Sequence, residues 1–151
     1  MLPEQIKSKL ERIKHLDIEI KGLYYELQYI DDSLFQKSTL TPSKVKTSQD
    51  NGIEKHLLNQ LELKDKITES IHKLIQERLK ITESIHKLIQ ERLKITELIN
   101  LLDAPLERTV LRMYYVNHLE VWKIAEQLSK GEATVYRKLR EAIKHLSEVV
   151  Q

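Results

Sequence analysis

Three cationic side chains near the carboxyl end of the sequence are spaced so that a helix would place them on one face. These are Arg137, Arg140 and Lys144, with Tyr136 beside them. Exposed guanidinium and ammonium groups bind phosphate oxygens, and a guanidinium can also pair with the edge of a guanine base. This stripe therefore predicts contact with a nucleic acid. The alternative is a solvated face on a trihelical module that is purely structural or binds protein.

The elements that would hold this stripe are three short helices at the end of the chain. Apolar periodicity predicts helices over residues 105–116, 120–128 and 132–149. The small residue Ala125 suits a close approach of two helices, and Ser129 to Gly131 read as a tight turn. A short helix, a turn of three or four residues with Gly and a longer helix together predict a helix-turn-helix over residues 104–151.

Five short motifs give this region a recognisable character: LER at 106–108, VL at 110–111, YY at 114–115, WKIA at 122–125 and TVYR at 134–137. With them, the segment from 106 to 146 resembles sigma-factor region four. It resembles more closely the ArpU-type phage regulators, which join such a module to an N-terminal helical arm. The resemblance implies that the last helix enters the DNA major groove and that the start of the preceding helix meets the DNA backbone.

Particular residues follow from that resemblance by position. Ala133, Thr134, Arg137 and Lys138 would face the groove. The full set of expected DNA-binding residues is Trp122, Lys123, Lys130, Ala133, Thr134, Tyr136, Arg137, Lys138, Arg140 and Lys144. The chain departs from the family at Gly131, where relatives usually place a Ser that caps the recognition helix. Gly is also an acceptable cap, at a cost of a few tenths of a kcal/mol against Ser, so this departure bears on affinity and not on the fold.

Residues 1–103 show the pattern of a coiled-coil arm. In a first helix over residues 3–36, apolar residues alternate at intervals of three and four along a heptad seam: Ile13, Leu16, Ile20, Leu23, Leu27, Ile30 and Leu34. Residues 37–52 are rich in Ser, Thr, Pro, Asn and Gly, which predicts a loop. A second helix is expected over residues 53–103. The predicted fold is all-α, with a long antiparallel helical hairpin followed by a small helix-turn-helix domain.

The second helix contains an exact repeat. Residues 66–79 recur unchanged as residues 80–93. Fourteen residues are two heptads, so the duplication keeps the seam in phase. Arg78 and Arg92 occupy seam positions, while Ile75, Ile89 and Leu93 widen the apolar stripe on one side, so the seam is either imperfect or shared by two partners. Without one copy the second helix would match the first in length. Whether the duplication is natural or engineered stays open.

Several classes of function have little support in the composition. The chain of 151 residues has no Cys, and it has no phosphate-binding Gly loop or nucleophile paired with a base. We therefore expect no enzyme activity, no cofactor and no metal site, and we interpret the repeated His72 and His86 as surface residues. No apolar run approaches a membrane span and no signal peptide is evident, which predicts a cytoplasmic protein.

Two functions from different classes remain. The resemblance implies a sequence-specific transcription regulator of a phage or related mobile element, controlling late or packaging genes. Its expected partners are double-stranded DNA, further copies of the chain in a homodimer or higher homo-oligomer held by the arm, and the host RNA polymerase. The alternative is a phage packaging protein of the terminase small-subunit kind, or a helical scaffold protein.

Overall fold

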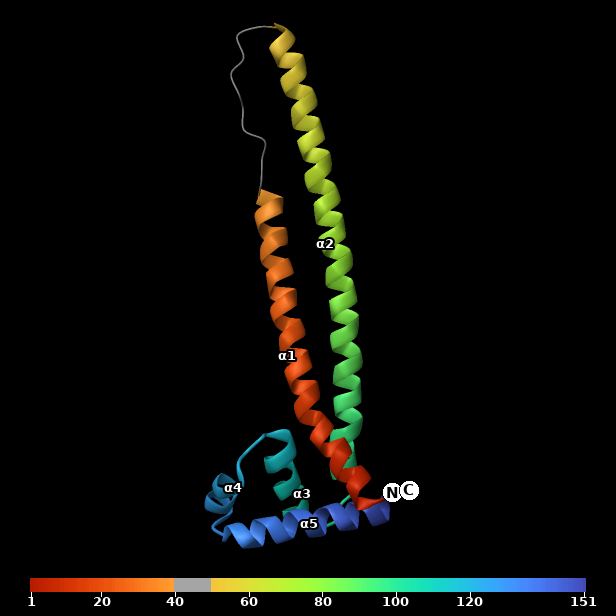
Figure 1. The fold of residues 1–151 in the computed structure, drawn as a ribbon, viewed down its shortest axis with the longest axis vertical. Helices are drawn as coiled ribbons and strands as arrows, with labels where there is room; N and C mark the ends of the chain where they lie inside the picture. The colour runs from red at the N-terminus through yellow and green to blue at the C-terminus, as the bar shows by residue number, and fades with distance from the viewer. Residues whose placement is uncertain (40–49) are drawn as a thin grey trace. The chain divides into compact units, whose positions relative to one another are not determined.

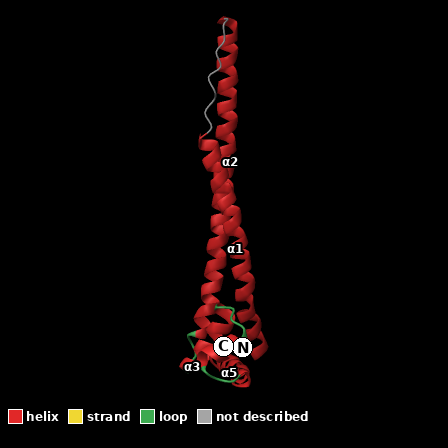
Figure 2. Cartoon of the chain, turned by 90° about the vertical axis from the view of Figure 1, so that its left-hand side faces the viewer, coloured by secondary structure: helices red, strands yellow, loops and turns green. Residues whose placement is uncertain are grey.

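The computed structural model describes residues 1–39 and 50–151, and these residues form helices without any strand (Figures 1 and 2). The helices are α1 (Pro3–Thr39), α2 (Asp50–Ile99), α3 (Pro105–Leu111), the π-helical segment η1 (Arg112–Val116), α4 (Val121–Leu128) and α5 (Glu132–Val149). The predicted all-α fold is confirmed. None of the described helices has an apolar stretch long enough to cross a bilayer.

Three predicted boundaries of the two long helices need correction, and α4 begins at Val121, one residue later than predicted. The predicted loop over residues 37–52 is helical at both edges, because α1 continues to Thr39 and α2 begins at Asp50; residues 40–49 of that loop lie outside the described residues. The second helix ends at Ile99 and not at residue 103. Hydrogen bonds from Asn100, Leu101 and Leu102 to carbonyls three residues earlier tighten its last turn. Pro105 then disfavours helical geometry at the residue before it.

The chain divides into two compact units. The helix-turn-helix unit comprises Met1–Lys21 and His86–Gln151, and the hairpin unit comprises Gly22–Ile85. The first unit thus combines the expected helix-turn-helix segment with the first turns of α1 and the last turns of α2.

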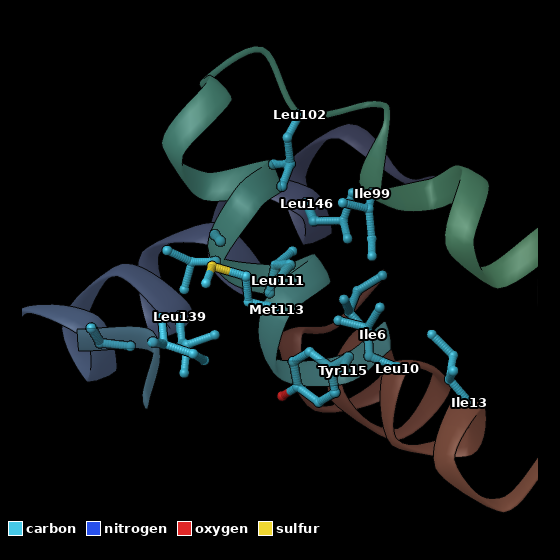
Figure 3. Packing of buried hydrophobic residues seen from close by; sticks show 14 of the residues in the cluster. Ile6, Leu10, Ile13, Ile99, Leu102, Leu111, Met113, Tyr115, Leu139 and Leu146 are labelled. Atoms are coloured by element: carbon cyan, nitrogen blue, oxygen red, sulfur yellow. The ribbon is translucent and has the colours of Figure 1, made fainter. Parts of the chain in front are cut away.

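The first turns of α1 complete the core of the helix-turn-helix unit. Ile6, Leu10, Ile13 and Leu16 are fully buried. They belong to the same hydrophobic cluster as residues of α2, α3 and α5, including Ile99, Leu111 and Leu146 (Figure 3). Full burial of one such side chain stabilises a fold by about 1.5–3 kcal/mol. Residues far outside 104–151 therefore supply a substantial part of the core around α5.

The two ends of the chain also meet within this unit (Figure 1). The ammonium group of Met1 donates hydrogen bonds to the carbonyl of Val150 at 2.7 Å and to that of Ser147 at 3.3 Å. The last carbonyls of a helix lack partners within the helix, and they carry partial negative charge. A cation at this position stabilises the end of α5.

In the hairpin unit, α1 and α2 lie side by side and run antiparallel (Figures 1 and 2). Arg78, which occupies an apolar position of the α2 seam, donates from Nε to Asp31 of α1 at 2.7 Å. The ion pair lets a charged side chain occupy a seam position, because its head reaches a carboxylate on the neighbouring helix while its stem covers apolar surface.

The helix-turn-helix unit contains the same contact one repeat later. Arg92 is the counterpart of Arg78 in the second copy, and its Nε donates to Asp17 of α1 at 2.6 Å. The two aspartates are separated by the same fourteen residues as the two arginines. Each copy of the duplicated sequence therefore makes the same cross-helix contact with α1, in the same register.

Candidate nucleic-acid interface

The turn between α4 and α5 is set by backbone hydrogen bonds at the end of α4. The N–H of Lys130 donates to the carbonyl of Ala125 at 2.9 Å, and that of Ser129 donates to Glu126 at 3.2 Å. Ser129 has φ 53° and ψ 44°, the left-handed conformation that follows many helices. Gly131 then forms the N-cap of α5 with φ −73°, so the glycine supplies the predicted cap while the serine makes the sharp bend.

Ser129→Gly should stabilise the helix-turn-helix unit. A left-handed conformation strains any residue that has a Cβ, and glycine adopts it without this cost. We expect the free energy of unfolding to rise by about 0.5–1 kcal/mol in chemical denaturation, with DNA affinity unchanged. Lys130→Gly is the matched control, because only Ser129 and His118 among the described non-glycine residues have positive φ. Lower stability of Ser129→Gly would contradict this account.

The orientation of α5 is fixed by packing on its apolar face and by one ion pair. Val135 and Leu139 of α5 belong to the same buried cluster as Ile124 and Ala125 of α4. On the side facing α3, Nδ1 of His145 lies 2.7 Å from a carboxylate oxygen of the buried Glu107. The opposite face of α5 is thereby directed to solvent.

The structure places most of the predicted DNA-binding residues at the surface of α4, α5 and the turn between them. Eight of the ten are exposed, and two on α5, Thr134 and Lys138, are partly buried. The exposed residues are Trp122, Lys123, Lys130, Ala133, Tyr136, Arg137, Arg140 and Lys144. Most of them lie on α5, two open α4, and Lys130 lies in the turn between these helices.

The cations of α5 differ in their surroundings. Nζ of Lys138 lies 3.0 Å from Glu141, and Nε of Arg137 lies 3.8 Å from the same carboxylate. The hydrogen bond from Lys138 is the main cause that lowers the pKa of Glu141. Within residues 1–39 and 50–151, Arg140 and Lys144 form no ion pair. Their positive charges are therefore not neutralised by a carboxylate among the described residues.

The first turn of α4 presents an aromatic ring and a cation together. The indole Nε1 of Trp122 donates a hydrogen bond to the carboxylate of Glu120. Nζ of Lys123 lies 5.3 Å from the centre of the Trp122 ring, within the range of a cation–π interaction. This arrangement orients both side chains at the end of α4 where contact with a DNA backbone is predicted.

An acidic residue of α1 supports the segment that leads into α4. Asp17 accepts from Arg92 of α2 through one oxygen, and its other oxygen lies 2.7 Å from Nε2 of His118. His118 has a left-handed backbone with φ 56° and lies three residues before α4. Sequence reasoning missed this contact, because neither residue belongs to a recognisable motif and they are 101 positions apart.

Asp17 should make the helix-turn-helix unit sensitive to acid. Burial by itself would raise the pKa of Asp17, but the hydrogen bonds from Arg92 and His118 outweigh it and hold the pKa below its ordinary value of 3.8. The stabilisation is present at neutral pH and is lost as the pH falls through the lowered value. In acid titrations followed by tryptophan fluorescence, Asp17→Asn should flatten the loss of stability below about pH 4. An unchanged slope would rule this role out.

The comparison with known families concerns most of the chain. Residues 49–147 match the family described as "Protein of unknown function (DUF1492)". The chain belongs to the DUF1492 family. No curated protein and no solved structure matches it. The part that matches DUF1492 includes α2, α3, η1 and α4 and ends within α5, so the buried turns of α1 lie outside it.

A pocket in this DUF1492 member lies beside the interface and is lined by the first turns of α1 and by residues 114–120. Glu11 and Glu120 line it together with Lys14 and His15. Burial raises the pKa of Tyr115, on its wall, to about 12, with further contributions from Tyr114 and Glu11. The lining therefore carries charges of both signs and is not a purely cationic or purely acidic site.

The repeated histidines of this DUF1492 member lie on the helix surface, and both His72 and His86 are exposed. In the part of the chain that the structure describes, no cluster of three or more His, Cys, Asp or Glu side chains could hold a metal ion.

Proposed function

We propose that this chain is a sequence-specific regulator of transcription that binds double-stranded DNA. We further propose that it belongs to the ArpU type and serves a phage or related mobile element, acting on late or packaging genes together with host RNA polymerase. The observation that carries the proposal is the exposed cationic face of α5, which follows α4 after a three-residue turn. A face of this kind on the second helix of such a pair suits insertion into the major groove.

The proposal assigns different roles to the cations of α5. Arg137 lies in the first half of the helix, where recognition helices contact base edges, and its planar group can bind both acceptors of a guanine. Arg140 and Lys144 lie farther along the same face and form no ion pair among the described residues. They would bind phosphates, which position the protein without reading the sequence. Trp122 and Lys123 would hold the backbone at the start of α4.

Two alanine substitutions should separate base reading from phosphate binding. Arg137→Ala is expected to weaken binding to the preferred site by about 1–3 kcal/mol and to relax the preference at one base pair. Lys144→Ala should weaken binding to all DNA sequences equally and reduce the slope of log affinity against log salt by about one unit. Both are measured by fluorescence anisotropy on matched specific and scrambled duplexes. If neither variant changes affinity, the α5 face does not bind DNA.

The broader function requires an unbiased experiment. Fragments of a phage genome that bind the full chain should be selected and sequenced, with the Arg137→Ala/Lys144→Ala double variant as the matched control. Enrichment at promoters of late genes would support regulation. Enrichment at packaging sequences, with a ring of many subunits in light scattering, would favour the terminase-like alternative. Recovery of no fragment above the control would remove both.

A further inference from the structure

The hairpin unit buries few of its own large apolar side chains. Within residues 22–39 and 50–85, only Ile30 and Ile85 of this kind are buried. Those that remain roughly half exposed or more are Tyr24, Tyr25, Tyr29, Phe35, Ile53, Leu57, Leu58, Leu61, Leu63, Ile75 and Leu79. Long helices gain most of their stability by burying an apolar face. A single seam between two helices leaves many of these apolar side chains in contact with water, so they contribute little to stability.

Five of these exposed residues line the same side of the seam. Relative to the heptad seam, Tyr24 of α1 takes position e, and the exposed residues of α2 on this side take positions b and e. In an antiparallel pair the e positions of both helices flank the same side of the seam. We call this side the apolar flank; it consists of Tyr24, Leu58, Leu61, Ile75 and Leu79, which are 44–61% exposed.

The other side of the hairpin unit is more polar, although Tyr29 at position c of α1 and Leu63 at position g of α2 are exposed there. Heptad position c of α2 carries Lys66, Lys73 and Lys80, all exposed, and position g carries Glu77. Along the solvated surface, Lys73 forms an i, i+4 ion pair with Glu69 at 3.6 Å. The lysines of the repeat therefore point away from the apolar flank. On the flank itself the carboxylate of Asp31 is already neutralised by Arg78.

We propose that the apolar flank docks against the same flank of a second copy of this chain, so that two hairpins form a four-helix bundle. The inference rests on the proposed function only in that a regulator with two recognition helices requires two copies. A two-fold interface brings one surface against itself, and this flank suits that arrangement because it is mainly apolar and carries no Lys. Its carboxylates are Asp31, which Arg78 pairs, and Glu54 and Asp65 at e and b positions of α2. Helices of such bundles use a wider apolar stripe than a single seam, as this hairpin has.

The four-helix bundle would explain why additional apolar residues lie beside the seam in the repeat. Ile75 and Leu79 of the first copy lie one position beyond Leu74 and Arg78, on the e side. Within one hairpin these two side chains stay 44% and 58% exposed. In the bundle they would pack against the second hairpin, so the two partners that share the stripe are α1 of the same chain and the second copy.

A charge placed on the flank should separate the copies, whereas the same charge placed elsewhere should not. We compare Leu79→Asp with Gln76→Asp, a matched control at an exposed outer position of the same helix. Sedimentation velocity on the full chain should give twice 17.9 kDa for the parent and for Gln76→Asp. Leu79→Asp should raise the dissociation constant about 100-fold, because it buries a carboxylate in an apolar contact. Circular dichroism checks that both variants remain helical.

A second measurement leaves the apolar residues untouched. The chain has no Cys, so single-Cys variants report one position each. Thr82 lies at position e and Ser84 at position g; both are exposed, and both hydroxyls donate to carbonyls four residues earlier. With increasing protein concentration, Thr82→Cys should become protected from a thiol reagent at least tenfold more than Ser84→Cys.

The outcomes separate this inference from the proposed function. A monomeric parent at 100 µM, equal association of Leu79→Asp and the parent, or equal protection of both cysteines would each overturn the four-helix bundle. The same three results would be obtained if the flank bound a different protein instead of a second copy. DNA binding is read separately, with a duplex carrying one half-site, which monomeric Leu79→Asp should still bind. A dimer that dissociates as expected but binds no DNA would remove the proposed function and leave the bundle standing.

Discussion

Leu10→Ala should destabilise the unit that carries α5 by about 2–5 kcal/mol, although Leu10 lies more than ninety positions before the predicted helix-turn-helix. The side chain is completely buried in the cluster that includes Leu111 and Leu146. Shortening it removes apolar contacts and leaves a cavity. The measurement is chemical denaturation followed by the fluorescence of Trp122, the only tryptophan, at the start of α4.

The matched control is Ile18→Ala in the same helix. Ile18 is 61% exposed, so this variant should change stability by no more than about 0.5 kcal/mol. The same reasoning predicts that residues 104–151 alone fold weakly or not at all, because Ile6, Leu10 and Ile13 would be missing from their core. A cooperative unfolding transition of the isolated segment at the stability of the full chain would show that these contacts are dispensable.

Deleting residues 80–93 should leave a folded hairpin, whereas deleting only residues 80–83 should not. The longer deletion removes two heptads and keeps the seam in phase. It moves Arg78 to the place of Arg92, opposite Asp17, and it moves Lys64 to the place of Arg78, opposite Asp31. Both cross-helix ion pairs can therefore form again. The shorter deletion turns the apolar residues of α2 away from α1.

Thermal unfolding followed by circular dichroism tests both deletions. The fourteen-residue deletion should melt within a few degrees of the parent, and the four-residue deletion should lose several kcal/mol and melt far lower. A seven-residue deletion is the control, since it preserves phase but shifts the register by one heptad. The helix shortens by about 21 Å in the longest deletion, so under the proposed function the preferred half-site spacing should also change. Equal melting of all three deletions would show that the seam does not determine the register.

The helices near the carboxyl end could be predicted closely because their signals are local. The bounds of α5 agree with the prediction, since Gly131 marks its start and Val135, Leu139, Ala142 and Leu146 mark its buried face. The exposed positions of Arg137 and Arg140 follow from the same periodicity. The π-helical turn from Arg112 to Val116 has no such signal, because its hydrogen-bond pattern depends on packing and not on residue type.

The contribution of α1 to the core around α5 could not be predicted in the same way. The spacing of Ile13 and Leu16 shows that one face of α1 is buried, but it does not show what covers that face. A coiled-coil seam and a contact with the helix-turn-helix core require the same apolar residues. The contact between Asp17 and His118 is still less accessible, since two polar residues so far apart in sequence are related only by the completed fold.

Because this core joins residues from distant parts of the chain, it cannot form until most of the chain has been synthesised. Ile6 and Leu10 leave the ribosome well before Leu146, although the three side chains share one cluster. Contacts of such high sequence separation form slowly and late, because the intervening chain must first be closed into a loop. During synthesis the apolar face of α1 therefore stays exposed to solvent until the later helices have emerged. This exposure favours early pairing with α2 and makes the nascent chain prone to aggregation. A chain that stops short of α5 would keep that face exposed, and it would be a substrate for chaperones and proteases.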